Sequence, residues 1–220
     1  MIDLHAHILP IDDGASDFDE AVEMCRIAAK NGTRKIVCTP HIMSDGYHIG
    51  LDKILYNMKK LQGLLKKQNI DIKLIQGAEN ALGNNITINK TKYVLIEFPP
   101  MDVPVYAEDT VRELLREHWV IIAHPELNRK IIENSGIIDK FLDLGCYLQL
   151  TAGSFLEPRF RNFAEQLVKE GKCHFIATDM HTPEEAADLI KAVEEVKKIS
   201  DRAMDFVTTN PEKVIAGEKI

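Results

Sequence analysis

The sequence predicts an α/β protein built on a parallel sheet, either an open doubly wound sheet or a closed barrel. Seven short runs rich in Val, Ile and Leu alternate with longer segments of helical periodicity. Most of these runs are apolar on both faces, which is typical of buried parallel strands. The expected strands cover residues 2–4, 35–39, 72–77, 93–97, 120–123, 146–150 and 173–177.

Amphipathic helices are expected between these strands. The first places Ala21, Met24 and Cys25 on one face, and Gly32 follows it as a stop signal. Residues 182–185 combine an N-cap threonine, a proline in the first turn and a capping-box glutamate. The expected helices cover residues 17–31, 51–68, 108–118, 130–144, 157–171, 182–198, 201–206 and 211–216. No Gly-rich nucleotide-binding loop follows the first strand, so a dinucleotide-binding or Walker-type protein has no support.

The composition is that of an ordinary globular protein. The 220 residues are 45% hydrophobic and 28% charged, and no linker or repeat divides them, so we expect one domain over residues 1–220. With 27 Lys and Arg against 34 Asp and Glu, the formal net charge is −7. An acidic chain is a poor nucleic-acid binder, because such binders need basic surfaces. No apolar run approaches the ~20 residues of a membrane helix, so membrane insertion is not expected.

The four cysteines indicate a reducing compartment. Cys25, Cys38, Cys146 and Cys173 stand far apart, and each lies in an apolar run typical of a buried free thiol. The chain begins without a basic segment or a long apolar stretch, so we expect a cytoplasmic location.

Metal-ligating residue types stand at the carboxyl ends of the expected strands. Six of the seven strands end in His, Asp or Glu, and active sites of barrels and open parallel sheets lie at this end. Residues two apart on a strand point the same way, so His5 and His7 can face one ion, as can Asp179 and His181. The candidate metal ligands are His5, His7, Asp13, His41, Glu79, Glu97, His124, Asp179 and His181.

These nine side chains suit two or three divalent ions that share a bridging carboxylate. Imidazole and carboxylate without thiolate favour manganese, iron or zinc. One such residue alone is an ordinary polar strand end, but nine at one mouth would repel or desolvate one another without cations. His48, in the polar loop 44–50, is a candidate to cover the site, whereas His118 and His174 are expected to be packing or surface residues.

The chain resembles the polymerase and histidinol phosphatase (PHP) superfamily, and more closely the bacterial manganese-dependent tyrosine-protein phosphatases of capsular and exopolysaccharide loci. The resemblance covers nearly the whole chain. Its motifs are Met-Ile-Asp-Leu-His-Ala-His at the start, Asp12-Asp13-Gly14, Thr39-Pro40-His41, Gly77-Ala78-Glu79, Leu95-Ile96-Glu97-Phe98, Ile122-Ala123-His124-Pro125-Glu126, Gln149-Leu150-Thr151-Ala152 and Ala177-Thr178-Asp179-Met180-His181.

This resemblance implies a distorted (β/α)7 TIM-like barrel of the PHP type with three divalent ions at its mouth, manganese being expected and iron or zinc staying open. It implies that His5, His7, Glu79 and Asp179 hold one ion, that Glu79 bridges to a second held by Glu97 and His124, and that Asp13, His41 and His181 hold the third. The implied activity is hydrolysis of phosphotyrosine on a bacterial tyrosine kinase of polysaccharide synthesis, by attack of a metal-bridging hydroxide. None of the four cysteines lies in a Cys-x5-Arg loop, which disfavours a phosphocysteine mechanism.

The chain departs from the resembled pattern at two places. Leu127 stands where the family usually has a phosphate-binding arginine, and the segment between Glu79 and Tyr93 is short. We expect Arg129, two positions further on, to take the catalytic role of that arginine, although its side chain could equally point to solvent. Arg159 and Arg161 are expected to bind substrate, although a solvated helix face would explain both equally well.

Three other functions stay open from the sequence. A PHP-type phosphatase of small substrates such as histidinol phosphate would use the same ligands. A weakly active metal-binding regulatory protein would explain Leu127. A proofreading exonuclease is disfavoured by the acidic charge and by the lack of an attached polymerase. Assembly into a homo-oligomer also stays open.

Overall fold

The computed structural model describes residues 1–42 and 49–220, and all seven expected strands form within them. The strands are β1 (Ile2–Ala6), β2 (Lys35–Cys38), β4 (Lys73–Gln76), β6 (Tyr93–Glu97), β7 (Trp119–Ala123), β8 (Tyr147–Thr151) and β9 (Phe175–Ala177). Two short strands were not expected, and they are β3 (His41–Ile42) and β5 (Glu79–Ala81). Each continues the path of the strand before it, β3 after β2 and β5 after β4.

The strands close into a barrel. Parallel pairing runs β1-β2-β4 in one sheet and β3-β5-β6-β7-β8-β9 in the other. The segment after β9 returns to β1, where Asp179 N donates to His5 O at 2.9 Å and His7 N donates to Met180 O at 3.0 Å. The division into two sheets falls at Gly77, where an added Cβ would lie 2.6 Å from Val37 Cγ1. The expected distorted (β/α)7 barrel is therefore confirmed, and the open sheet is excluded.

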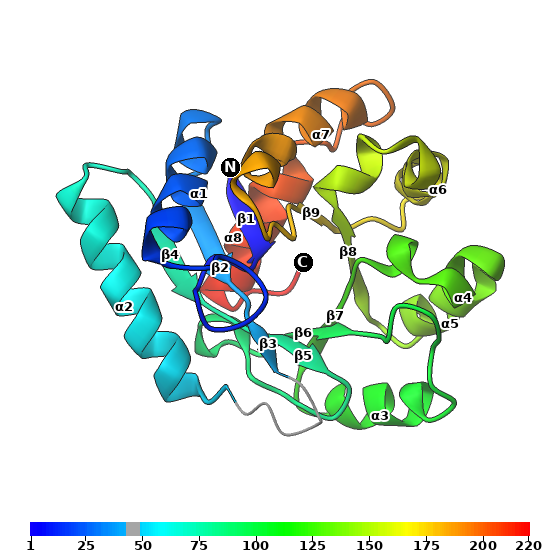
Figure 1. Ribbon diagram of the computed structural model, residues 1–220. Coiled ribbons are helices and arrows are strands. Elements are labelled where there is room, and N and C mark those ends of the chain that lie inside the picture. The colour runs from blue at the N-terminus through cyan, green and yellow to red at the C-terminus, as the bar shows by residue number, and fades with distance from the viewer. Residues whose placement is uncertain (43–48) are drawn as a thin grey trace.

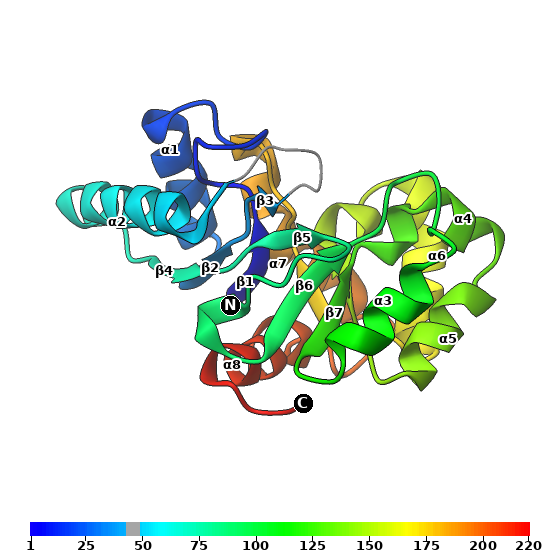
Figure 2. The ribbon, with the colours of Figure 1, turned by 90° about the horizontal axis from the view of Figure 1, so that it is seen from below.

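Helices surround the strands, as Figure 1 shows. They are α1 (Phe18–Lys30), α2 (Leu51–Lys67), α3 (Ala107–Leu114), α4 (Arg129–Glu133), α5 (Gly136–Asp143), α6 (Pro158–Lys169) and α7 (Asp188–Val196). A further helix, α8 (Thr209–Ala216), lies beside the start of β1, at the end of the barrel where the strands begin (Figure 2). None of the helices within residues 1–42 and 49–220 is long and apolar enough to span a membrane.

Three expected helices differ from the structure. The segment 130–144 forms two helices, because Asn134 leaves the helical region at φ −146° and ψ 87° and Gly136 follows. The segment 182–198 begins as a 3-10 turn (Pro183–Ala187) and becomes α-helical only at Asp188. The segment 201–206 holds only the 3-10 turn Asp205–Val207.

Apolar side chains fill the base of the barrel, the end where the strands begin. Leu4, Val37, Leu95, Ile121 and Phe175 are fully buried in one cluster, and residues of α8 complete it from below. Two further clusters lie between the strands and the surrounding helices. The four cysteines are buried and free, as expected. Polar side chains therefore gather at the mouth of the barrel, the end where the strands finish.

Candidate metal centre

Four donor atoms converge at the end of β1. The Nε2 atoms of His5 and His7 are 3.1 Å apart. Glu79 Oε2 lies 3.1 Å from both nitrogens, and Asp179 Oδ1 lies 3.2 and 3.4 Å from them. One ligand atom from each of these four residues is close enough to the others to bind a common ion.

Glu79 stands at the junction of two groups of ligands. Its Oε1 lies 2.7 Å from His124 Nε2, and its Oε2 lies 3.2 Å from His41 Nδ1. His124 Nε2 is also 3.9 Å from Asp179 Oδ2. A carboxylate whose two oxygens face histidines on different strands has the position that a bridging ligand requires.

A further group lies on the more open side of the mouth. Asp13 is 63% exposed, and its two oxygens lie 3.5 Å from His41 Nε2 and 3.6 Å from His181 Nε2. Glu97 Oε1 lies 3.2 Å from His41 Nδ1. The structure thus brings all nine candidate ligands into one cluster. Within this cluster Glu97 contacts His41, and His124 contacts Glu79.

Local backbone geometry places the ligands. An added Cβ at Gly14 would lie 1.8 Å from His7 O, so only glycine allows the turn that returns Asp13 to His7. His124 and Asp179 adopt left-handed backbone conformations, with φ of 31° and 55°. Non-glycine residues held in this region commonly mark functional sites, because the surrounding structure must maintain the strain.

Strong ion pairing perturbs the protonation of the cluster. Burial opposes the charge of His124, but Asp179 and Glu79 outweigh it and raise the pKa of His124 to about 10. Burial likewise disfavours the charge of Asp179, yet His5 and His124 lower its pKa to about 2. The pKa of Glu79 falls well below its usual value, because those histidines again outweigh its burial. The buried carboxylates therefore favour positive charge beside them, which divalent ions would supply on binding.

Two orphaned atoms test whether this donor set fits metal ions. Within the described ranges, Glu79 Oε2 and His41 Nδ1 are buried and form no hydrogen bond, although they lie only 3.2 Å apart. Buried polar atoms without partners are costly, and both lie where ligands of one ion would lie. The residues present therefore fit divalent cations.

Sequence reasoning missed the residues that orient the ligands. Asp12 Oδ2 accepts hydrogen bonds from His7 Nδ1 at 2.9 Å and from the His41 backbone N at 3.1 Å. Gln149 Oε1 lies 2.9 Å from His5 Nδ1. When Nδ1 is the donor in these contacts, Nε2 keeps a free lone pair for a metal. The available signals were the position of Asp12 next to Asp13 and a glutamine within an apolar strand.

Buried acids support the loops of the mouth. Asp3 accepts hydrogen bonds from Thr178 Oγ1 at 2.6 Å and Thr178 N at 3.0 Å, which ties β1 to the end of β9, and burial raises its pKa to about 6. Glu126 accepts from Thr151 N at 2.7 Å and Ser154 Oγ at 2.8 Å. Burial raises the pKa of Glu126 to about 7.

The three candidate arginines separate in the structure. Arg129 and Arg159 line one cavity of about 520 Å³ beside the mouth. Arg161 instead pairs with Glu165 and Glu195 between α6 and α7, so the structure does not bring it to this cavity.

The remaining histidines lie apart from the cluster or outside the described residues. His174 Nδ1 accepts a hydrogen bond from Leu148 N at 3.1 Å, as a packing residue would. His118 is likewise absent from the contacts of the cluster within the described ranges. The expected cover from His48 falls outside the described residues.

The chain is similar in sequence to known proteins over most of its length. Residues 1–216 match the family model described as capsular polysaccharide synthesis, CpsB/CapC. The tyrosine-protein phosphatase YwqE of Bacillus subtilis is 35% identical over 196 residues, which cover 82% of this chain and 77% of that protein. The putative tyrosine-protein phosphatase CapC of Staphylococcus aureus is 27% identical over 237 residues, covering 100% of this chain and 93% of that protein.

Solved structures agree with the sequence relatives. A structure reported for YwqE from Bacillus subtilis and CpsB from Streptococcus pneumoniae, unique metal-dependent tyrosine phosphatases, matches with a TM-score of 0.93. It is 32% identical, and the match covers 100% of this chain and 96% of that chain. A lactonase from Listeria monocytogenes, 12% identical with a TM-score of 0.60 over 99% of this chain and 95% of its own, shares the fold alone.

Proposed function

The chain belongs to the CpsB/CapC family of capsular polysaccharide synthesis, and we propose that it is a metal-dependent protein-tyrosine phosphatase acting on a tyrosine kinase of that synthesis. One observation carries the proposal: nine histidine and carboxylate side chains meet at the barrel mouth around Glu79, two of their buried atoms lacking partners. The names of the relatives supply the substrate class. We propose that residues 1–220 act as a single domain.

The site would hold three divalent ions, with manganese as the proposed metal. His5, His7, Glu79 and Asp179 would hold one ion, and Glu79 would also serve a second ion together with Glu97 and His124. When bound, such ions neutralise phosphate charge and lower the pKa of water to near neutrality. The more exposed Asp13 would hold the third ion together with His41 and His181, at the open side of the mouth.

The residues of the chain perform the remaining tasks. Asp12 and Gln149 keep His7 and His5 in one orientation, so the donor set is arranged before substrate arrives. A tyrosine leaving group has a pKa of ~10, so it needs less proton donation than an alkyl alcohol. Hydrolysis of an aryl ester therefore depends mainly on the charge and placement that the mouth provides.

The cysteines are unsuited to the thiol route. Burial raises the pKa of both Cys25 and Cys146 to about 12, and burial raises the pKa of Cys38 and Cys173 well above its usual value. A buried neutral thiol is a weak nucleophile, because the thiolate is the reactive form. This supports the metal-dependent route.

Substrate assays with manganese test the proposal. Purified protein is supplied with Mn²⁺ and p-nitrophenyl phosphate, a phosphotyrosine peptide, histidinol phosphate or the phosphorylated tyrosine kinase of the same locus. We expect turnover of the aryl phosphates and the kinase, and its loss in the His5→Ala/His7→Ala variant. His174→Gln, which removes a histidine outside the cluster, is the matched control and should retain turnover.

Two outcomes would overturn the proposal. Preference for histidinol phosphate would assign the chain to the small-molecule phosphatases. Absence of metal-dependent turnover on every substrate would leave a non-catalytic metal-binding protein. Turnover on peptides but not on the kinase would reject the proposed partner alone.

A further inference from the structure

Two cavities beside the metal cluster share the side chain of Leu127. One, of about 330 Å³, is lined by the cluster residues Asp179 and His181 at one side and by Leu127 and Phe160 at another. The acids Glu157, Glu185 and Asp188 also line it, and Leu127 and Phe160 belong to the apolar part of its wall. Its volume is in the range of small-ligand sites. A phosphate held at the cluster end of this cavity would have its leaving group beside Leu127 and Phe160.

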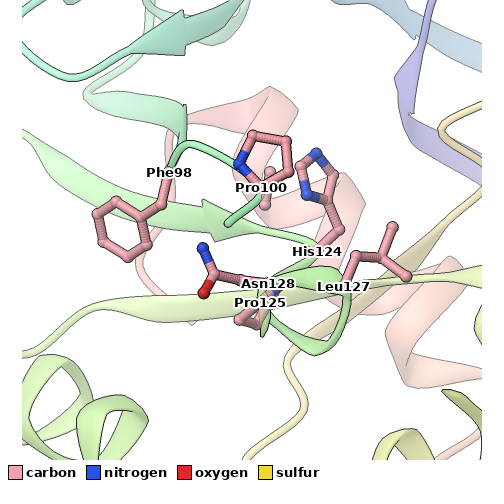
Figure 3. A pocket seen from close by; sticks show the side chains of 7 residues that line it. Phe98, Pro100, His124, Pro125, Leu127 and Asn128 are labelled. Atoms are coloured by element: carbon pink, nitrogen blue, oxygen red, sulfur yellow. The ribbon is translucent and has the colours of Figure 1, made fainter. Parts of the chain in front are cut away.

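The second cavity, of about 130 Å³, continues the apolar surface. It is lined by His124, Leu127 and Pro100, and Figure 3 shows the His124 ring between Pro100 and Leu127. Leu127 is only partly buried, so it still has apolar surface to cover. Covering such surface with an aromatic ring is favourable, whereas a short alkyl chain covers less of it.

Neighbouring hydrogen bonds hold Leu127 in place. Leu127 N donates to His124 O at 3.0 Å. The preceding Glu126 accepts hydrogen bonds from Thr151 N at the end of β8 and from Ser154 Oγ just after it. The following Asn128 donates from Nδ2 to Pro99 O at 2.8 Å and Asp102 O at 3.0 Å. A wall held on both sides needs little ordering when a ring binds, which favours affinity.

A third cavity, of about 520 Å³, lies beyond this wall. It shares Leu127 and Phe160 with the first cavity, and it is lined by Arg129 and Arg159. Of the described residues, no member of the metal cluster lines it. Arg129 Nε lies 2.9 Å from Glu133 Oε1. The cavity is therefore lined by two guanidinium groups, of Arg129 and Arg159, and by one carboxylate, of Glu133. An excess of positive charge there suits acidic side chains of a bound peptide.

We propose that Leu127, Phe160 and Pro100 form an aryl wall that selects aromatic phosphate esters, and that Arg129 and Arg159 bind acidic residues beside the phosphotyrosine. The proposal rests on the proposed phosphatase function and names the substrate that this site prefers. It places the two arginines on the peptide and leaves the phosphate to the metal cluster.

Two small phosphonates test the aryl wall without requiring turnover. Phenylphosphonate and methylphosphonate differ in the ring alone, and calorimetry measures the Kd of each for the Mn²⁺-loaded protein. Leu127→Ala should weaken phenylphosphonate about fivefold, because part of an apolar contact is lost, and should leave methylphosphonate unchanged. Phe160→Ala should act in the same direction. Met204→Ala, which truncates an exposed apolar side chain outside the three cavities, is the control.

The outcomes of this test are distinct. An equal loss for both phosphonates, or no loss for either, would overturn the aryl wall. If ring selectivity is found but no ester is hydrolysed, the phosphatase function fails while the wall stands. If esters are hydrolysed but the protein shows no preference for the ring, the phosphatase function is supported and the aryl wall is rejected.

Peptide substrates test the arginines. Two phosphotyrosine peptides are compared, one with glutamates on both sides of the phosphotyrosine and one with glutamines. In Arg129→Ala/Arg159→Ala the KM for the glutamate peptide should rise about tenfold at low salt, with little change in kcat, and the difference should shrink in 0.5 M salt. Arg112→Ala is the matched control, because Arg112 forms the same i,i+4 pair on α3. A loss of kcat with both peptides would place the arginines on the phosphate instead.

Discussion

The two ends of the barrel are built from the same strands but meet different physical requirements. At the mouth, His5, His7 and Glu79 are fully buried and contact mainly one another. At the base, Tyr93 and Phe175 are fully buried, and Tyr93 OH donates to Glu218 O at 2.8 Å. The Tyr93 hydroxyl is thus satisfied by the chain itself.

This difference separates stability from function. The base gains its stability from apolar burial and from partners that the chain supplies, such as the Glu218 carbonyl. The mouth concentrates charged groups, and buried atoms there lack partners. Such an arrangement is costly on its own and becomes favourable when cations bind. Changes at the mouth should therefore alter metal binding and turnover, and changes at the base should alter folding.

The largest expected effect is at Glu79. Glu79→Ala removes the carboxylate between the histidines, so kcat/KM with Mn²⁺ should fall by roughly 10³-fold or more. In the unaltered protein, Mn²⁺ at 100 times its Kd should add about 2.7 kcal/mol to the free energy of unfolding, and the variant should lose this gain. Urea unfolding with Mn²⁺ or EDTA measures it. Glu108→Ala, at an exposed acid on α3, should behave like the unaltered protein. Full Mn²⁺ stabilisation in Glu79→Ala would refute a bridging role.

At the base, Phe175→Ala should produce the opposite result. Phe175 is 0% exposed and contacts the ring of Tyr147, so truncation should cost about 3–5 kcal/mol of unfolding free energy. The kcat of the folded fraction should stay within about twofold. Fluorescence of the single tryptophan, Trp119, follows the unfolding. Phe175→Leu, which leaves a smaller cavity, should cost less. A large drop in kcat with stability preserved would contradict the separation of the two ends.

Gln149 tests orientation at the mouth without removing a ligand. Gln149→Leu keeps a side chain of similar size but leaves His5 Nδ1 without its partner. The affinity for Mn²⁺ should fall about 10- to 100-fold. The unfolding free energy of the metal-free protein should change little, because the variant also removes Gln149 Nε2, a buried atom without a partner. A Mn²⁺ titration measures the affinity, with Gln166→Leu on the surface of α6 as control. Unchanged affinity would mean that packing alone orients His5.

The smallest effect is the pH response of His174. Burial, with Arg202 nearby, lowers the pKa of His174 to about 4 from a usual 6.5, and its neutral ring accepts a hydrogen bond from Leu148 N. As pH falls from 6.5 to 4, the unfolded chain takes up the proton first, so the unfolding free energy should decrease by about 2 kcal/mol, allowing for partial exposure. Above pH 6.5 this contribution is complete. His174→Gln should flatten the profile, and equal slopes for both proteins would reject the role of His174.

Particular residues show how far sequence patterns reached. The apolar runs predicted all seven strands, because burial on both faces leaves an uninterrupted signal. The short β3 and β5 were missed, since two or three residues after a proline or glycine carry no periodic pattern. The helix expected at 130–144 was wrong at Asn134, whose dihedral angles break a helix that its apolar spacing favoured.

The sequence alone determined the succession of strands and helices, the nine candidate ligands and the family resemblance, because each depends on residue types in order along the chain. The tertiary structure decided that Glu97 faces His41, that Asp12 and Gln149 orient histidines, and that Arg161 pairs on the outer helices while Arg129 and Arg159 share a cavity. Several of these contacts join distant parts of the chain, such as His5 with Gln149, 144 positions away. Closure of the barrel between β9 and β1 likewise brings Thr178 to Asp3, 175 positions away, which no local pattern encodes.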